Sequence, residues 1–337
     1  MVAADRSRTV AATLCTAALA LALVSAPVSA EHSPRVVFRI ASPDITESSS
    51  LVVSTVESGL VYTANDSGDT ATVYVLAARS GAVVGRAQLT GVTPLDIEAL
   101  SAGSDGALVV ADIGDNGADR TSVALYKIPQ PGRGPGEVAA DRVALRYSDG
   151  PRDAEAIVYD AASGRVFVVG KEFSGAHVYR TPPDVFSRSR AVLRPVADAP
   201  LFATDATLLP GGDLAVIRTY FDAVVYRYPG WVKVQSFVLP RQPQGESVAA
   251  PARGGHLWIG SEGQNSAVLS VPLPLIEPVE ATATPTGVPS PTTASQASPH
   301  HELLKSATRV VIVVAVGALA LVVALVGVLY RRHRRAA

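Results

Sequence analysis

The segment DIEALSAGSDGALVVADIGDN, Asp96 to Asn116, contains two apolar runs joined by a Ser-Asp-Gly turn. Short apolar runs on either side of such a turn are typical of a β-hairpin. Acids stand at the start of the first run and at the end of the second, where a buried strand should carry no charge. Because antiparallel partners start and end at the same edge, these acids are predicted to lie together at one end of the hairpin.

The pattern of this segment recurs five times between residues 31 and 274. Each copy opens with an acid followed by a small residue, at Glu47–Ser48, Glu98–Ala99, Glu155–Ala156, Asp205–Ala206 and Glu246–Ser247. Each then has a glycine-bearing turn, a second apolar strand, a polar loop and a third strand. The first four copies add a fourth strand, whereas the fifth has none. A separate apolar run, RVVFRI at Arg35–Ile40, precedes the first copy.

Short strands in a repeat of about 40 to 57 residues are typical of the blades of a β-propeller. The sequence therefore predicts an all-β fold, a five-bladed β-propeller of four-stranded blades. The N-terminal strand would complete the last blade and close the ring, which leaves no long sheet edge exposed. A six-bladed ring with one degenerate blade is the alternative.

The first strand of each propeller blade lines the central channel, so the repeated acids are predicted to form a ring at one channel mouth. The candidate metal ligands are Glu47, Glu98, Glu155, Asp205 and Glu246. Asp96 and Asp153 stand two residues before two of them. The ends of the second strands add Asn65 and Asp66 and the candidate ligand-binding residues Asp112, Asp115, Lys171, Arg218 and Glu262.

Like charges in one mouth repel and raise each other's pKa values unless positive charge compensates them. One alternative is internal pairing, in which Lys171 and Arg218 bind neighbouring carboxylates and other acids bind backbone N–H groups. The other is a hard cation, best Ca²⁺, which takes about six to eight oxygen ligands. The segment ADIGDNGAD, Ala111–Asp119, lacks the distal Glu of an EF-hand and favours an Asx-stabilised loop.

Both ends of the chain predict export and anchoring. Residues 1–30 combine a basic start, an apolar core and small residues before the cleavage position, as a signal peptide does, and they contain the only cysteine, Cys15. Residues 275–308 are rich in Pro, Thr and Ser and predict an extended stalk. Residues 309–330 predict a transmembrane helix, and the arginines of residues 331–337 predict a cytoplasmic tail. We therefore expect a bacterial cell-surface protein, with the propeller outside the membrane.

Charge and motifs limit the function. The formal net charge of −1 includes the basic C-terminus, so the ectodomain alone is acidic and no nucleic-acid partner is expected. No Gly-x-Ser-x-Gly motif is present, and no histidine has a Ser and acid partner by position. The expected partners are an extracellular ligand or protein and, through the C-terminal helix, the membrane.

The segments ADIGDN, KEFSG, QGES and SEG resemble bacterial secreted propellers of the phytase-like and WD-repeat-like groups, over about residues 45–274. The resemblance to phytase-like propellers implies Glu98, Glu155 and Glu246 as Ca²⁺ ligands. It also implies Lys171 and Arg218 as phosphate contacts. The paired-Asp-Pro-Ala motif of true phytases is absent. We expect a ligand- or protein-binding module with a channel Ca²⁺; the alternative is a metal-dependent phosphoesterase on the acidic face.

Overall fold

The computed structural model describes residues 34–66 and 70–276. The chain divides into two compact units, residues 1–277 and 278–337, and every described residue belongs to the first. The predicted signal peptide, transmembrane helix and cytoplasmic tail, and all of the predicted stalk after Ile276, lie outside the described residues. Within the described part, no helix is long and apolar enough to cross a membrane.

The described chain is all-β, with 21 strands, one short 3₁₀ helix at Val185–Ser187 and no α-helix in these residues. The strands are β1 (Arg35–Arg39), β2 (Val52–Val53), β3 (Leu60–Thr63), β4 (Thr72–Ala77), β5 (Val83–Thr90), β6 (Ile97–Ala102), β7 (Ala107–Asp112), β8 (Val123–Pro129), β9 (Gly134–Ala139), β10 (Asp141–Tyr147), β11 (Ala154–Asp160), β12 (Arg165–Gly170), β13 (His177–Arg180), β14 (Arg190–Asp198), β15 (Ala203–Leu208), β16 (Leu214–Thr219), β17 (Asp222–Arg227), β18 (Val232–Val238), β19 (Gly245–Ala249), β20 (His256–Ser261) and β21 (Ala267–Pro272).

The strands pair into sheets built from one recurring unit of four antiparallel strands. Two sheets are single units, β15-β16-β17-β18 and β19-β20-β21-β1. A third sheet is β2-β3-β4-β5 with β9 added parallel to β5. The fourth sheet joins two units, β6-β7-β8-β10 and β11-β12-β13-β14, through parallel pairing of β10 with β14.

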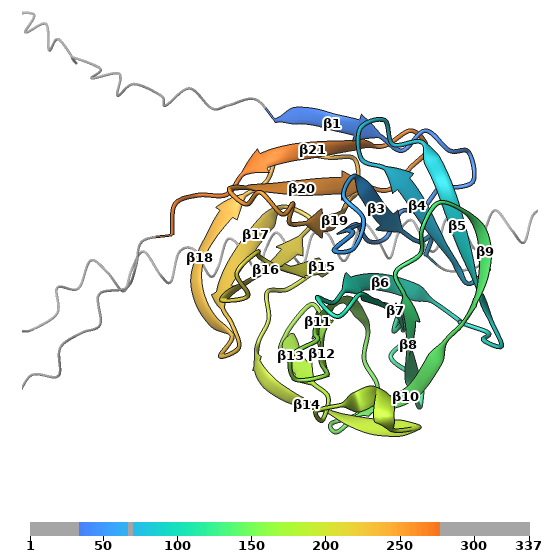
Figure 1. Ribbon diagram of the computed structural model, residues 1–337. Helices are drawn as coiled ribbons and strands as arrows, with labels where there is room; N and C mark the ends of the chain where they lie inside the picture. The colour runs from blue at the N-terminus through green and yellow to red at the C-terminus, as the bar shows by residue number, and fades with distance from the viewer. Residues whose placement is uncertain (1–33, 67–69, 277–337) are drawn as a thin grey trace, which may run out of the picture. The chain divides into compact units, whose positions relative to one another are not determined.

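The units are arranged around a common centre (Figure 1). Their first strands contact one another in a closed cycle, β2 with β6, β6 with β11, β11 with β15, β15 with β19 and β19 with β2. The N-terminal strand β1 pairs antiparallel with β21, so the first and last strands of the described chain share one sheet. Radial repetition with such closure is a β-propeller-like fold.

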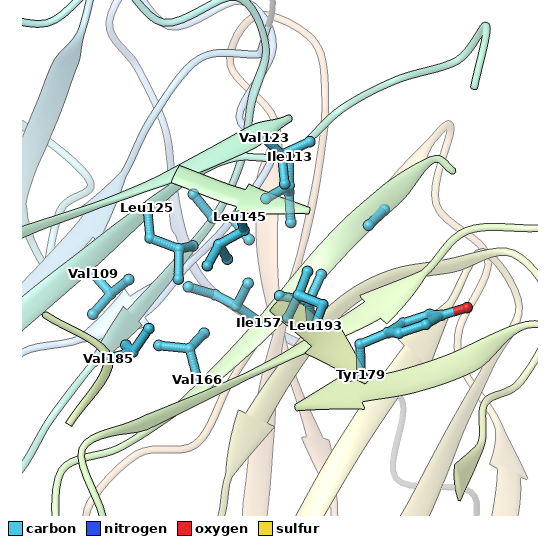
Figure 2. Packing of buried hydrophobic residues seen from close by; sticks show 14 of the residues in the cluster. Val109, Ile113, Val123, Leu125, Leu145, Ile157, Val166, Tyr179, Val185 and Leu193 are labelled. Carbon is cyan, nitrogen blue, oxygen red and sulfur yellow. The ribbon is translucent and has the colours of Figure 1, made fainter. Parts of the chain in front are cut away.

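Apolar side chains fill the spaces between neighbouring units rather than one central core. One buried cluster lies between the units of β6 and β11, and comparable clusters lie at the other contacts between neighbours. Figure 2 shows the first of these, with Val109, Ile113, Val123, Leu125, Leu145, Ile157, Val166, Tyr179, Val185 and Leu193 labelled. Because the inner strands of each sheet are covered on both faces, they alternate little in burial, and β7 is buried throughout, whereas outer strands such as β5 and β10 alternate.

Strand β9 was not expected from the sequence, since its segment GPGEVA contains two glycines and a proline. It lies at the edge of its sheet, where proline is tolerated because the missing N–H faces no partner strand. Its pairing with β5 extends the β2-β3-β4-β5 sheet outward and leaves the innermost strand, β2, unchanged.

Candidate functional site

Three glutamates occupy equivalent positions on the innermost strands. The register between β6 and β7 shifts at Glu98, and the register between β11 and β12 shifts at Glu155. Glu246 lies within the corresponding shift between β19 and β20. Such a bulge re-aims the side chain of its extra residue. We call the end of the propeller around these residues the mouth, and it comprises Glu47, Asp66, Asp96, Glu98, Asp153, Glu155, Lys171, Tyr220, Glu246 and Glu262.

Asp205 does not join this set, contrary to the predicted ring. The register between β15 and β16 shifts between Ala203 and Asp205, so Thr204 takes the position of the glutamates. Asp205 comes one residue later, is 1% exposed, and accepts the N–H of Val248 and of Ala206, each at 2.8 Å. Because side chains alternate along a strand, this offset turns the carboxylate away from the mouth and into the packing against β19.

Glu47 lies at the mouth, but two residues before the bulge position. The side-chain oxygen of Asn65 accepts the N–H of Glu47, as the carboxylate of Asp112 accepts the N–H of Asp96. Glu47 is therefore equivalent to Asp96, and Ser49 stands where three of the other units carry a glutamate. The sequence alignment of the repeats was correct for three acids and out of register for Glu47 and Asp205.

The candidate metal site is formed by Asp66, Asp96 and Glu98. One carboxylate oxygen from each residue lies within 4.8 Å of the other two. Asp66 follows β3, whereas Asp96 precedes β6 and Glu98 lies within it, so the cluster joins two neighbouring units. Three carboxylate oxygens at this spacing suit one hard cation such as Ca²⁺.

Glu98 is the buried member of this cluster. Its residue is 5% exposed, and within the described part of the chain its carboxylate has no hydrogen bond or ion pair. Burial, followed by the nearby carboxylates of Glu155, Asp66 and Asp96, raises the pKa of Glu98 far above its usual range. A buried carboxylate without a partner is costly when ionised, and a bound cation would remove that cost.

Asp96 shares this electrostatic environment. Burial and a hydrogen bond with Asp66 raise the pKa of the Asp96 carboxyl to about 7. Its Oδ1 atom is buried and has no hydrogen-bond partner among residues 34–66 and 70–276. The site therefore contains a second carboxylate oxygen that the described protein groups leave unsatisfied.

Gly114 provides the space for these two carboxylates. A Cβ atom on Gly114 would overlap the carboxylate of Asp96 and lie 2.6 Å from Oε1 of Glu98. The Gly114 N–H also donates to the carbonyl of Asp96 at 3.3 Å, which holds the loop after β7 against the start of β6. This role of Gly114 was not predicted, although the sequence has a glycine two residues after a strand that ends in an acid.

The other side of the mouth is compensated by Lys171, as the internal-pairing alternative predicted. Its ammonium group forms an ion pair with Glu155 and lies 5.2 Å from the ring centre of Tyr220. Burial raises the pKa of Glu155 to about 8, and Lys171 opposes that rise. The sequence thus placed Lys171 correctly at the mouth, whereas Tyr220 was missed because the fourth repeat was misaligned.

Arg218 is not at the mouth surface. It is 0% exposed, and its guanidinium donates to the carbonyls of Ser247 at 2.6 Å and Gly260 at 2.7 Å and to Oε1 of Gln242 at 2.8 Å. These bonds tie β16 to β19 and β20. The predicted contact between Arg218 and a ligand is not supported by this placement, because its donors are directed at two backbone carbonyls and at the side chain of Gln242.

Asp112 and Asp115 stabilise the loop between β7 and β8. Asp112 forms an ion pair with Arg120 at 2.7 Å, and both residues are buried or nearly so. The carboxylate of Asp115 accepts the N–H groups of Asp119 and Arg120, at 3.0 and 2.9 Å. This is the Asx-stabilised loop that the sequence favoured over a calcium loop. Neither Asp112 nor Asp115 belongs to the Asp66–Asp96–Glu98 cluster, although the carboxylate of Asp112 accepts the backbone N–H of Asp96.

Glu262 and Glu246 complete the acidic side of the mouth opposite Glu98. Burial, followed by the carboxylates of Glu246, Asp66 and Glu47, raises the pKa of Glu262 to about 7. Burial also raises the pKa of Glu246, while Lys171 lowers it. These interactions connect Glu262 to the same mouth, where the sequence had placed it.

A polar groove of about 840 Å³ borders the mouth beside Glu47. It is lined by Asp44, Thr46, Glu47, Asn65, Thr70, Thr72, Tyr74, Arg86, Gln88, Pro135, Gly136 and Glu137. Within it, Arg86 forms an ion pair with Asp44 and lies over the ring of Tyr74 at 5.3 Å. Strand β9 supplies one wall, so the unpredicted edge strand contributes to the groove.

No family model matches the chain, and no curated protein sequence matches it. Among solved structures, it is similar to a PQQ-bound aldose sugar dehydrogenase from Streptomyces coelicolor, with 11% identity and a TM-score of 0.45 over 71% of this chain and 97% of the other. It is also similar to the hydrazine synthase of Kuenenia stuttgartiensis, with 13% identity and a TM-score of 0.40 over 65% of this chain and 56% of the other. Similarity at this level assigns no activity to the chain.

Proposed function

We propose that the protein is a cation-dependent ligand-binding module, in which Ca²⁺ occupies the Asp66–Asp96–Glu98 cluster. The observation that carries this proposal is the buried carboxylate of Glu98, which has no partner in the described residues and shares its cluster with two further carboxylates. A hard oxygen-ligated cation compensates such a group better than any protein group near it. Oxygen atoms of water and of the bound ligand would complete the coordination of the cation.

The position of the cluster supports a binding role. Asp66 and Asp96 belong to different units, so a bound cation would crosslink the first two units at the mouth. The groove beside Glu47 offers a concave polar surface, and its lining residue Asn65 directly precedes Asp66 of the cluster. Ligand sites commonly combine a concavity with a few converging polar groups. In this proposal the bound cation orders the edge of the groove and adds a positive charge there.

We also propose that the propeller has five blades and is displayed outside the cell membrane on a stalk. The five-blade count is supported by the four-stranded antiparallel units and by a packed cluster between each pair of neighbours. Export and anchoring are supported by the apolar segments near both ends of the sequence.

A metal-dependent phosphoesterase is the second candidate, and Lys171 is the observation that favours it. A lysine beside a bound cation can hold a phosphate while the cation activates a water molecule. The burial of Arg218 removes the second phosphate contact that the sequence suggested. Hydrolysis of p-nitrophenyl phosphate by the Ca²⁺-loaded parent, lost in Lys171→Met, would favour the enzyme over the binding module.

Calorimetric titration of the purified full chain with Ca²⁺ tests the proposed function. We expect one site in the parent, with an affinity at least about tenfold weaker in Glu98→Gln and Asp96→Asn, since each variant removes a charged ligand. Asp213→Asn is the matched control, because Asp213 is an exposed acid in the turn between β15 and β16, at the opposite end of the propeller. No Ca²⁺ binding by the parent, or equal binding by all variants, would overturn the proposal.

A further inference from the structure

Exposed apolar side chains lie in the connections that surround the mouth. Phe173 follows β12 and is 84% exposed, and Phe221 lies between β16 and β17 and is 70% exposed. Leu95 and Leu201 precede β6 and β15, and both are also exposed. We call Leu95, Phe173, Leu201, Phe202 and Phe221 the rim. Large exposed apolar patches on soluble proteins commonly mark interaction surfaces.

Part of the rim is continuous across two neighbouring units. The rings of Phe173 and Phe202 pack edge to face with their centres 5.1 Å apart, although they come from different units. A second aromatic pair is formed by Tyr220 and Phe221, whose ring centres lie 6.3 Å apart. Tyr220 also contacts Lys171. The backbone N–H of Phe202 also donates to the carbonyl of Glu172. These contacts give two aromatic pairs at the acidic mouth, Phe173–Phe202 and Tyr220–Phe221, and we call the two pairs together the aromatic strip.

The backbone of Phe202 is held in an uncommon conformation. Its φ angle is +58°, in the left-handed region that a bulky residue rarely adopts. Such a conformation persists only where the surrounding contacts enforce it. Here it keeps an aromatic ring against Phe173 at the edge of the mouth rather than in the interior.

The mouth next to the strip is rich in carboxyl groups. The mouth contains the carboxylates Glu47, Asp66, Asp96, Glu98, Asp153, Glu155, Glu246 and Glu262. Lys171 belongs to the mouth and already forms an ion pair with Glu155. Arg120 and Arg218 also act on Asp96 and Glu246, but Arg120 is paired with Asp112 and Arg218 donates to backbone carbonyls. A partner that buried the aromatic strip would therefore also approach these carboxyl groups, and a cation placed there would favour their ionised form. Charge complementarity requires that partner to be basic.

We propose that the mouth and its rim bind a protein segment in which a Lys or Arg side chain stands between apolar residues. The apolar residues would cover Phe173, Phe202 and Phe221, while the basic side chain would enter the side of the mouth formed by Glu246 and Glu262. Aromatic anchors beside a charged centre are typical of interaction hot spots. This inference rests on the proposed role as a binding module, but not on occupation of the cluster by Ca²⁺.

Selection of a random twelve-residue phage-displayed peptide library on the purified full chain tests the proposal. We expect enrichment of peptides with a Lys or Arg flanked by aromatic or aliphatic residues. The best synthetic peptide should bind at least about tenfold more weakly to Phe173→Ser and Phe221→Ser, because hot-spot truncations cost this much or more. Val56→Ser is the matched control, since Val56 is 59% exposed in the turn between β2 and β3, at the opposite end.

Enriched peptides without basic residues, or equal binding to parent and rim variants, would overturn the proposal. Rim-dependent binding to phosphatidylcholine vesicles in place of peptides would overturn it too, by identifying a lipid surface as the occupant. Both rim side chains are exposed, so the variants are expected to keep the thermal stability of the parent. Phe173→Ser is expected to bind Ca²⁺ as the parent does, because Phe173 lies outside the Asp66–Asp96–Glu98 cluster. Ca²⁺ titration of this variant therefore tests the cation site separately from the peptide site.

Discussion

Asp205 and Arg218 lie opposite each other in the ladder between β15 and β16, and both side chains bind the backbone of the next unit. Asp205 accepts the N–H of Val248, and Arg218 donates to the carbonyls of Ser247 and Gly260. Two charged residues that the sequence suggested as metal ligand and phosphate contact therefore fasten the fourth unit to the fifth.

This arrangement predicts that Arg218→Met destabilises the protein without acting on the cation site. The substitution leaves two buried carbonyls and the Asp205 carboxylate without their donor or counter-charge, so we expect a loss of about 3 kcal/mol or more in the free energy of unfolding. Urea unfolding measures it. Arg227→Met is the control, because Arg227 is exposed on the neighbouring strand β17 and should change stability by less than about 0.5 kcal/mol.

If Arg218→Met were as stable as the control and instead lost affinity for inorganic phosphate, Arg218 would be a ligand contact after all. The same experiment on Asp205→Asn should also show destabilisation. If Asp205→Asn folds, an unchanged Ca²⁺ affinity would show that Asp205 is not a ligand in the metal cluster.

Much of the architecture could be predicted from the sequence, because each strand carries its own local signal. The runs LVYTAND, ALVVAD, RVFVVGK, DLAVIRT and HLWIGSE contain β3, β7, β12, β16 and β20, and RVVFRI contains β1. Hydrophobic runs bounded by glycine turns mark strands independently of the rest of the chain. The pairing of β1 with β21 also followed, since a repeat lacking its fourth strand needs a partner for its open edge.

The candidate site could be predicted only in part, because it depends on register. Glu98, Glu155 and Glu246 share a bulge position, but Asp205 resembles them in sequence while standing one residue beyond it. A bulge is a property of the hydrogen bonds between two strands and leaves no clear pattern of residue types. A shift of one residue moves a side chain to the other face, so the predicted ring of five acids was wrong at this position.

Gly114→Ala is predicted to weaken Ca²⁺ binding while the fold is retained. The added Cβ would overlap the carboxylate of Asp96 and crowd that of Glu98, so at least one ligand must move. We expect the affinity measured by calorimetry to fall by about tenfold or more, since a rigid ligand set tolerates little displacement.

The matched control for this substitution is Gly117→Ala, in the same loop. There the nearest atom to an added Cβ is Oδ2 of Asp119 at 3.4 Å, an ordinary contact. Equal Ca²⁺ affinity in Gly114→Ala and the parent would mean that the cation does not use the carboxylates of Asp96 and Glu98 together.

The mouth carboxylates predict an unusual dependence of stability on pH. The pKa values of Asp96 and Glu262 are raised to about 7, and that of Glu155 to about 8, mainly by burial. Since the folded state then binds protons more tightly than the unfolded state, this stabilisation is complete below about pH 4 and is lost as the pH rises through about 7 to 8.

Thermal unfolding in EDTA should therefore give a lower Tm near pH 8 than near pH 5, and Asp96→Asn should reduce the difference. Ca²⁺ should raise the Tm more near pH 8, because protons compete with the cation for the same carboxylates. A Tm in EDTA that stayed constant over this range would show that the mouth carboxylates are solvated and titrate normally.

Lys171→Met is predicted to affect cation affinity and stability in opposite directions. The substitution removes the counter-charge of Glu155 and of its neighbours, so repulsion among the mouth carboxylates increases in the cation-free protein. We expect a loss of about 1 to 3 kcal/mol in the free energy of unfolding in EDTA. The same increase in negative charge should strengthen Ca²⁺ binding by roughly threefold to tenfold. Calorimetry and urea unfolding of one preparation measure both effects.

Lys127→Met is the control, because Lys127 forms a comparable ion pair with Asp105 beside the turn between β6 and β7, at the opposite end of the propeller. It should lower stability slightly and leave the Ca²⁺ affinity unchanged. If Lys171→Met weakened Ca²⁺ binding, the Lys171–Glu155 ion pair would be holding the carboxylates of the cluster in place. The prediction that the charge of Lys171 opposes the cation would then be wrong.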